Sequence, residues 1–363
     1  MPLSLTPLAI SNLFTICWKE ICLVSGVPFG LAMPSATPNQ FPASRGQTGA
    51  IACSVGIMAH NEEANIGRLL EAIVCQRTTT VTVSEILVVA SGCTDRTVEI
   101  VRDWARLDNR IRLLVQPRRE GKSSAVNEFL RNAREKVVVL CSADLLPQRD
   151  TIEQVVAPFI DPEVGMISSR PVPANDPASF MGFAAHLLWG LHHQINLRGF
   201  KAGELIAFRK IFERIPYRTS VDEASVEPVI RGQGYRLMYV PTAIVYNKGP
   251  ETVDDFLRQR RRIYAGHLAL RDALGYNVST MSGLTILGLL LRTMDWRPRQ
   301  FVWTWAVAAL EVYGRILGKR DYDSRHDHMV WELAKTTKEF KVLPIPQIAE
   351  GWQVQEIPDT TVR

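Results

Sequence analysis

The segment from Val137 to Asp144 reads VVVLCSAD, and it indicates both the fold class and the edge at which a ligand binds. Five consecutive apolar residues, most of them β-branched, are typical of a strand that is buried on both faces. The run ends in Ser142-Ala143-Asp144, so a carboxylate follows directly after the strand. In open α/β sheets, ligands bind beyond the carboxyl ends of the strands. Asp144 is therefore a candidate metal-binding or catalytic residue, and an ordinary turn residue is the alternative.

Three further apolar runs precede this segment and alternate with helical patterns. We expect strands at residues 54–58, 86–89 and 111–115, and helices that carry the apolar residues of 66–74, 98–105 and 125–133. Thr94 is expected to cap the second helix. Strands that alternate with helices of this length predict an α/β fold with a mostly parallel sheet flanked by helices.

The chain after Asp144 has a less regular pattern. Strands are expected at 164–169 and 203–208, with an amphipathic helix at 179–195 between them. His186, His192 and His193 lie within this helix, but no carboxylate stands at ligand spacing beside them. We therefore expect them on the helix surface or in an acceptor cleft rather than at a metal.

Two charged clusters follow. Asp222 and Glu223 stand at the start of a helical pattern, where acids either complement the helix dipole or serve a reaction. Four arginines occupy five positions at 258–262, with Tyr264 close by. Such a cluster suits a multivalent anion such as a pyrophosphate, and a surface of anionic lipid is the alternative.

Composition excludes several classes of protein. The chain has 363 residues, 46% hydrophobic and 22% charged, which excludes wholesale disorder, collagen and coiled coil. Its net charge of +5 is too mild to indicate nucleic acid as a partner. Six scattered cysteines with no CxxC pair predict reduced thiols and a reducing compartment. Residues 1–50 have the composition of a loosely ordered lead-in that ends in a flexible linker.

The most apolar part of the chain lies at 284–291 and 301–310. Each stretch has about ten residues, whereas a membrane-spanning helix needs about twenty. Tryptophans and arginines surround both stretches, which is typical of helices that lie in a membrane interface. The alternative is that these helices cover the catalytic domain or build a dimer.

Taken together, six strings in order resemble a family 2 glycosyltransferase with the GT-A (Rossmann-like) fold. They are AHNEEANI at 59–66, VVASGCTDRT at 88–97, GKSSAVN at 121–127, SADLLP at 142–147, VDEA at 221–224 and QRRRI at 259–263. The resemblance covers about residues 51–270. It implies a nucleotide-binding half at 51–147, an acceptor half at 148–270, and a helical, partly interfacial membrane-associating region and tail at 271–363.

The resemblance implies inverting transfer of a sugar from a nucleotide-sugar donor to an acceptor hydroxyl. Asp222 holds the position of the family's catalytic base, with Glu223 as a neighbouring acid, and Asp144 would hold Mg²⁺ or Mn²⁺. The remaining residues that the resemblance assigns to the donor are Asn61, Glu62, Ser91, Asp95, Lys122, Asn127, Gln259, Arg260 and Arg262. The acceptor is expected to be a lipid or lipid-linked molecule at the cytoplasmic face of a membrane, with peripheral or monotopic attachment.

The chain departs from the family's pattern at four places. Ala90 and Ser91 replace paired acids, Ser142 begins the metal motif, and Val221 stands before the base. Ile263 replaces a tryptophan that is associated with polymer synthesis, so we expect single additions. The alternatives are a catalytically weakened, sugar-nucleotide-binding scaffold and a soluble glycosyltransferase.

Overall fold

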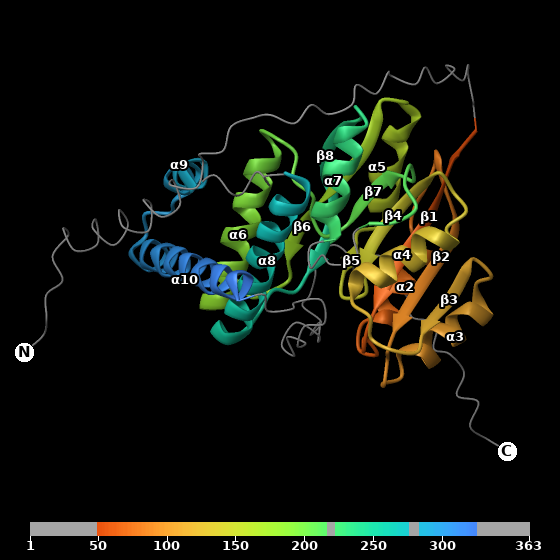
Figure 1. The fold of residues 1–363 in the computed structure, drawn as a ribbon, viewed down its shortest axis with the longest axis horizontal. Coiled ribbons are helices and arrows are strands. Elements are labelled where there is room, and N and C mark those ends of the chain that lie inside the picture. Colours follow the sequence, from red (N-terminus) through yellow and green to blue (C-terminus); the bar gives the residue numbers. More distant parts are fainter. Residues whose placement is uncertain (1–48, 216–221, 276–282, 325–363) are drawn as a thin grey trace, which may run out of the picture. The chain divides into compact units, whose positions relative to one another are not determined.

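The computed structural model describes residues 49–215, 222–275 and 283–324. The described residues form one mixed sheet with helices on both faces, followed by a group of long helices (Figure 1). The strands, in the order β3-β2-β1-β4-β7-β6-β8-β5, are β1 (Ile51–Ala59), β2 (Val81–Ser91), β3 (Ile111–Gln116), β4 (Val137–Ser142), β5 (Leu146–Pro147), β6 (Val164–Pro173), β7 (Ile206–Arg209) and β8 (Arg236–Asn247). The expected fold class, a mixed and mostly parallel α/β sheet with helices after it, is confirmed.

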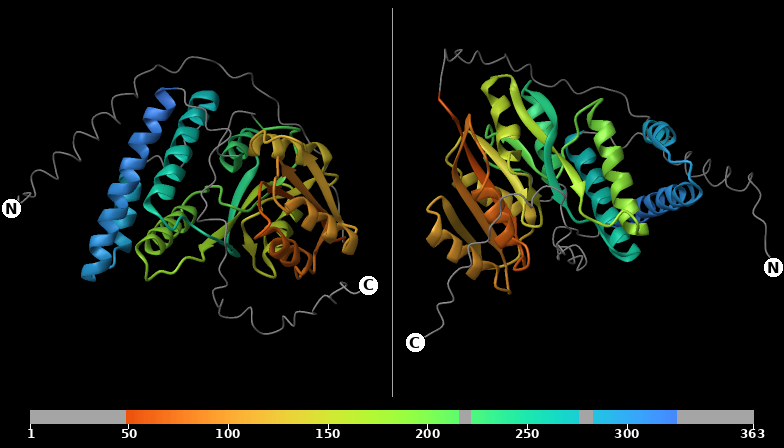
Figure 2. Two further views of the ribbon diagram at one scale, coloured as in Figure 1. Left: turned by 90° about the horizontal axis from the view of Figure 1, so that it is seen from below. Right: turned by 180° about the vertical axis from the view of Figure 1, so that it is seen from behind.

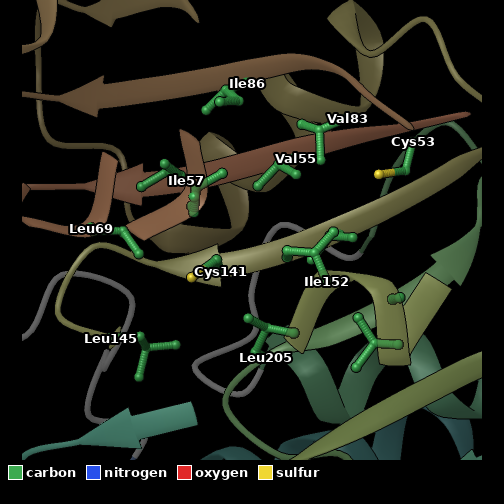
Figure 3. Packing of buried hydrophobic residues seen from close by; sticks show 14 of the residues in the cluster. Cys53, Val55, Ile57, Leu69, Val83, Ile86, Cys141, Leu145, Ile152 and Leu205 are labelled. Atoms are coloured by element: carbon green, nitrogen blue, oxygen red, sulfur yellow. The ribbon is translucent and has the colours of Figure 1, made fainter. Parts of the chain in front are cut away.

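The first four strands form the parallel part of the sheet. β1 pairs in parallel with β2 and with β4, and β2 pairs in parallel with β3. Alternate residues of β1 enter two different cores, because both faces are covered by helices. Val55 and Ile57 pack with α2 (Ile66–Val74), α3 (Thr97–Leu107) and α5 (Thr151–Val156), as Figure 3 shows for part of this core. Met58 packs on the other face with α4 (Lys122–Asn132) and α7 (Asp222–Gly232).

Gly56 explains how α4 lies so close to the sheet. A Cβ at this position would stand 2.6 Å from the ring of Phe129, which is fully buried. Any side chain at residue 56 would displace the phenyl ring and with it the helix whose first residue is Lys122.

In the second half of the sheet, β7 and β5 run opposite to the other strands. β7 runs antiparallel to β4 with Leu140 opposite Ile206, and β6 runs antiparallel to β7. β8 pairs in parallel with β6, and the short β5 pairs antiparallel with β8. The strand expected at 203–208 begins at Ile206, and the sequence analysis missed β8, α5 and the 3₁₀ turn Ala157–Ile160.

Four helices complete the described part: α6 (Phe180–Asn196), α8 (Val253–Leu274), α9 (Gly283–Thr293) and α10 (Pro298–Asp323). α8 and α10 lie side by side (Figure 2). They pack closely because a Cβ on Gly314 would stand 2.7 Å from Cβ of Arg260, and one on Gly318 would stand 2.7 Å from the Arg261 carbonyl oxygen. Among the described helices none is both long and apolar enough to cross a bilayer.

Two local expectations have clear outcomes. Thr94 does not cap α3, because the helix begins three residues later, at Thr97, whose amide donates to Asp95 Oδ1 at 3.0 Å. The four cysteines in the described ranges are free thiols, two of them buried (Cys53 and Cys141). The expected lead-in of residues 1–50 lies almost entirely outside the described residues.

Candidate active site

Three carboxylates and two cations meet beyond the carboxyl end of β4. Asp144 follows this strand directly. Glu204 stands two residues before β7, and the antiparallel register that places Ile206 opposite Leu140 brings it to the same edge. Glu223 comes from the first turn of α7, and its Oε1 accepts a hydrogen bond from Lys122 Nζ at 2.5 Å. We call these residues, together with Arg262 of α8, the acid–cation cluster.

The electrostatics show that the members of this cluster act on one another. Burial raises the pKa of Asp144, Glu223 raises it further, and the charges of Lys122 and Arg262 lower it. Burial also raises the pKa of Glu204 to about 7, with contributions from Glu223 and Asp144. Three carboxyl groups that repel one another when ionised, in a site shielded from solvent, are typical of a place that binds a cation or an electrophile.

Arg260, which the sequence analysis predicts to bind the donor's diphosphate beside Arg262, lies outside this cluster in the structure. On a helix, side chains two positions apart in the sequence point in directions that differ by about 200°. Arg262 acts on Asp144 and Glu204, whereas Arg260 faces α10, where its Nε lies 3.3 Å from Glu311 Oε2. Its guanidinium also lies over the ring of Phe256.

The loops after β1 and β2, expected to contact the nucleotide, are tied to each other. Asn61 adopts a left-handed backbone conformation (φ 52°) that asparagine tolerates, and its Oδ1 accepts from the Thr94 amide at 2.8 Å. The Asp95 carboxylate accepts from the amides of Glu63 and Thr97 and from the Thr97 hydroxyl. The structure therefore brings these predicted residues to one edge, but Asp95 is occupied in holding the two loops together.

Glu62 and Ser91, two more predicted donor contacts, are buried at the same edge. Glu62 is 6% exposed and accepts from Asn65 Nδ2 at 3.1 Å, and Ser91 is 5% exposed. The Ser91 carbonyl oxygen lies 2.7 Å from His60 Nδ1, which joins the ends of β1 and β2. Glu62 and Ser91 are therefore buried beneath the loops that carry Asn61 and Thr94.

Asn127, another predicted donor contact, lies on α4. It is fully buried, its Nδ2 donates to the Ile215 carbonyl oxygen at 3.1 Å, and its Oδ1 accepts from the Ile215 amide at 2.7 Å. These two bonds fasten the segment that leads toward α7. Gln259 lies on α8 and is partly exposed.

Asp222, the predicted base, is the first residue of α7, and Glu223 follows it. The side chain of Asp222 and the preceding Val221 lie outside the described residues. The Lys122–Glu223 ion pair nevertheless fixes the start of this helix beside α4.

The chemistry of the cluster fits a divalent cation that is shared with a substrate. In the described ranges there is no group of three or more side chains arranged to ligate a metal by themselves. Mg²⁺ is commonly bound by one or two carboxylates together with substrate phosphates. Asp144 offers one such carboxylate, and Glu204 adds acidic charge at the same edge.

Comparison with known proteins shows which family this part of the chain resembles. Residues 54–223 match the family model described as Glycosyl transferase family 2. The chain carries a family 2 glycosyltransferase domain. This domain contains the loops after β1 and β2, Asp144, Glu204 and the start of α7. We refer to it as the glycosyltransferase domain.

Solved and curated relatives agree with this assignment. The glycosyltransferase domain and the helices after it resemble a mannosyltransferase from Pyrobaculum calidifontis that was solved with GDP-mannose and Mn²⁺. The TM-score is 0.55 at 20% identity, over 87% of this chain and 96% of that one, which shows the GT-A fold. A poly-β-1,6-N-acetyl-D-glucosamine synthase of Staphylococcus aureus is 25% identical over 203 residues, covering 52% of this chain. The chain spans 49% of that relative's length.

A shorter similarity covers only part of the glycosyltransferase domain. A dolichyl-phosphate β-glucosyltransferase of Trichomonas vaginalis is 37% identical over 71 residues, which is 20% of this chain. The described chain thus has the GT-A fold, and residues 54–223 match family 2 glycosyltransferases.

Proposed function

We propose that the chain catalyses inverting, metal-dependent transfer of one sugar from a nucleotide-sugar donor to an acceptor hydroxyl. The observation that carries this proposal is the acid–cation cluster, in which Asp144 and Glu204 lie within electrostatic reach of Lys122 and Arg262. A single displacement at the anomeric carbon needs a base for the acceptor proton and a stabiliser for the departing diphosphate. The cluster offers charged groups for the diphosphate, and the base would come from the helix that carries Glu223.

Asp222 is the proposed base. Its place at the start of α7, next to the glutamate that Lys122 holds, puts it on the element that borders the cluster. In this proposal Glu223 keeps the start of α7 beside α4 and does not itself take the proton, because its carboxylate already accepts from the Lys122 ammonium.

Asp144 is the proposed ligand of Mg²⁺ or Mn²⁺, together with the donor's diphosphate. The bound ion would supply a Lewis acid for the leaving diphosphate. Arg262 would add a fixed positive charge on the same side, since it already lowers the pKa of Asp144 and of Glu204. Asn61 and the loop at Thr94 would border the nucleoside.

We further propose that the acceptor is a lipid or lipid-linked molecule at a membrane surface. Several large apolar side chains of α9, α10 and the turn between them are exposed: Leu291, Trp296, Val302, Val312, Tyr313 and Ile316. Trp296 is 72% exposed and stacks on Phe301. Aromatic and aliphatic side chains next to the exposed Arg292 and Arg297 suit the interface of a bilayer.

The opposite side of these helices packs on protein. Leu289 and Leu290 pack with Leu191 and Ile195 of α6, and Trp303 contacts Phe180 and Phe183 edge-on. Attachment by one face of α10 is therefore the form of membrane contact that we propose. We assign it to the cytoplasmic face, where an exposed thiol such as Cys75 stays reduced.

Single addition remains part of the proposal. Ile263 lies on α8 directly after Arg262, at the position where the family's polymerising members are expected to have tryptophan. An aliphatic side chain offers no aromatic platform for a growing sugar chain.

A screen of nucleotide sugars tests the proposed function. In a thermal-shift assay with Mn²⁺, the true donor is expected to raise the melting temperature in proportion to its affinity. Release of the nucleoside diphosphate should then require both a divalent cation and Asp222, so Asp222→Asn should lose turnover but keep donor binding. Donor binding without turnover at any acceptor would instead support the scaffold alternative.

A further inference from the structure

A second group of charged side chains occupies another face of α8 and has no role in the proposed transfer. It consists of Lys201, Arg260, Arg315 and Glu311, which we call the basic cluster. Glu311 lies between the two arginines, with its Oε2 at 3.3 Å from Arg260 Nε and its Oε1 at 3.1 Å from Arg315 Nε. Lys201 lies within electrostatic reach of all three.

The basic cluster has two more positive than negative charges. It holds three cations and one carboxylate. Glu227 of α7 also acts on Lys201, but it is paired with Arg231 at 3.3 Å, so counting that pair leaves the excess unchanged. The buried His267 adds no charge, because burial and the cations around it lower its pKa to about 3.

One cation of the cluster, Lys201, differs from the two arginines in its contacts. Lys201 Nζ makes no hydrogen bond or ion pair with any described residue. Arg260 Nε and Glu311 Oε2 are buried and lie 3.3 Å apart as an ion pair, but neither atom makes a hydrogen bond within the described part of the chain. Shielded charges are normally paired, since leaving one unpaired is strongly unfavourable. An ammonium held beside two guanidinium groups therefore favours the binding of an anion at this place.

The helices hold this arrangement in place without a ligand. α10 buries one face, formed by Thr304, Val307, Gly314, Gly318 and Asp321, at spacings of three, four and seven residues. Gly314 and Gly318 allow close contact with α8, and Asp321 accepts two hydrogen bonds from Arg261, at 2.9 and 2.7 Å. Glu311 lies at the centre of this face. The cations are thus preorganised by the backbone and not gathered by an anion.

The basic cluster is close to the acid–cation cluster. Lys201 precedes Glu204 by three residues, and Arg260 precedes Arg262 by two. Three extended residues span at most about 11 Å, and two helical residues rise about 3 Å. One acceptor molecule can therefore reach both clusters.

We propose that Lys201, Arg260 and Arg315 bind the phosphate group of a phosphorylated acceptor. A phosphate monoester carries a charge of about −1.5 to −2 at neutral pH, which matches the excess positive charge, and its oxygens accept from guanidinium and ammonium donors. The identification of the phosphate's carrier as a sugar acceptor rests on the proposed function. The binding of phosphate by these three residues does not depend on it.

The test uses the full chain and inorganic phosphate as the probe, at constant ionic strength set with chloride. Phosphate should raise the melting temperature in a saturable manner. Lys201→Met and Arg315→Gln should each weaken phosphate binding by about tenfold or more, because each removes a charged donor. Lys201→Arg should keep binding. Arg320→Gln, at an exposed arginine of α10, is the matched control and should bind as the unaltered chain does.

A second measurement separates this site from the donor site. Binding of a nucleoside diphosphate with Mn²⁺ should be unchanged in Lys201→Met and weakened in Arg262→Gln, while phosphate binding should show the reverse pattern. Phosphate binding that survives Lys201→Met and Arg315→Gln, or that is lost only in Arg262→Gln, overturns the proposal. A chain that binds phosphate at Lys201 but turns over no donor would keep the site and refute the proposed function.

Vesicles identify the source of the phosphate. Phosphatidylcholine vesicles with and without phosphatidic acid are compared by sedimentation. A phosphatidic-acid-dependent fraction that Lys201→Met abolishes supports the site with a lipid phosphate as its ligand. Equal sedimentation of both proteins, with loss of inorganic phosphate binding in the variant, supports it with a soluble phosphorylated acceptor.

Discussion

The Lys122 ammonium donates to the Glu223 carboxylate at 2.5 Å and so joins the first turn of α4 to the first turn of α7. The two residues are 101 positions apart in the sequence. Both side chains are about one-fifth exposed, so solvent screens the pair only in part. This contact connects the proposed donor half to the helix that begins with Asp222.

Replacing Lys122 with Met should weaken diphosphate binding by about tenfold or more. The change removes a positive charge from the cluster and leaves the Glu223 carboxylate without this partner, which increases the negative charge beside Asp144. Calorimetric titration with a nucleoside diphosphate and Mn²⁺ measures the effect. The double variant Lys122→Met, Glu223→Gln removes both charges and should recover part of the loss. Equal affinities in the single variant and the unaltered chain would show that the pair is only structural.

Replacing Asp144 with Asn should abolish metal-dependent turnover without destabilising the fold. Burial raises the pKa of this carboxyl above its ordinary value of 3.8, so its charge is unfavourable in the folded chain at pH 7. We therefore expect an unchanged or higher melting temperature, and a loss of turnover of about a hundredfold or more. Asp150→Asn, at an exposed acid between β5 and α5, is the control. A lower melting temperature with retained turnover would make Asp144 a structural residue.

Much of this arrangement could be predicted from the sequence, because the parallel half has strong local signals. The apolar run before Asp144 predicts a strand buried on both faces, and this strand pairs in parallel with β1, as expected for a mostly parallel sheet. Glu204 could not be found in this way. Glu204 lies at the site because β7 runs antiparallel to β4. The local sequence at residues 203–208 does not indicate in which direction this strand runs in the sheet.

The two arginines of α8 show the same limit. Helical periodicity places Arg260 and Arg262 on different faces, but it does not say which face meets the glycosyltransferase domain. The answer depends on Gly314 and Gly318 of α10, which lies about fifty residues later and packs against the face of Arg260. Contacts of such long range decide the role of a residue whose local pattern is ambiguous.

Acid should destabilise the protein through two buried histidines, His192 and His267. Burial lowers the pKa of each to about 3, so both are neutral in the folded chain, whereas the unfolded chain binds protons at the ordinary value of 6.5. The unfolded state therefore binds more protons between pH 6.5 and 3. Stability is highest above this window and falls as the pH decreases through it.

Urea unfolding at pH 7.5 and 5.5 measures this effect. Each histidine should contribute a loss of about 1.4 kcal/mol in the free energy of unfolding between the two pH values. His192→Gln should reduce the pH dependence by about that amount. His186→Gln, at a partly exposed histidine of the same helix, is the control. The same pH dependence in His192→Gln and the unaltered chain would contradict the assignment.

The exposed apolar face of α10 should govern attachment to membranes. Val302 is 62% exposed and Ile316 is 38% exposed, two turns on either side of Ala309 on the same side of the helix. Burying such a side chain in a bilayer interface contributes about 1.5 to 3 kcal/mol, so the double variant Val302→Asp, Ile316→Asp should lose at least tenfold in partitioning. Sedimentation with vesicles of phosphatidylcholine and phosphatidylglycerol gives the partition coefficient. Leu107→Asp, at a leucine of α3 that is 76% exposed, should partition normally. Both proteins should keep the melting temperature of the unaltered chain, because all three side chains face solvent. Normal partitioning of the double variant would leave α10 as a helix that covers the protein and would remove the structural basis for a membrane-bound acceptor.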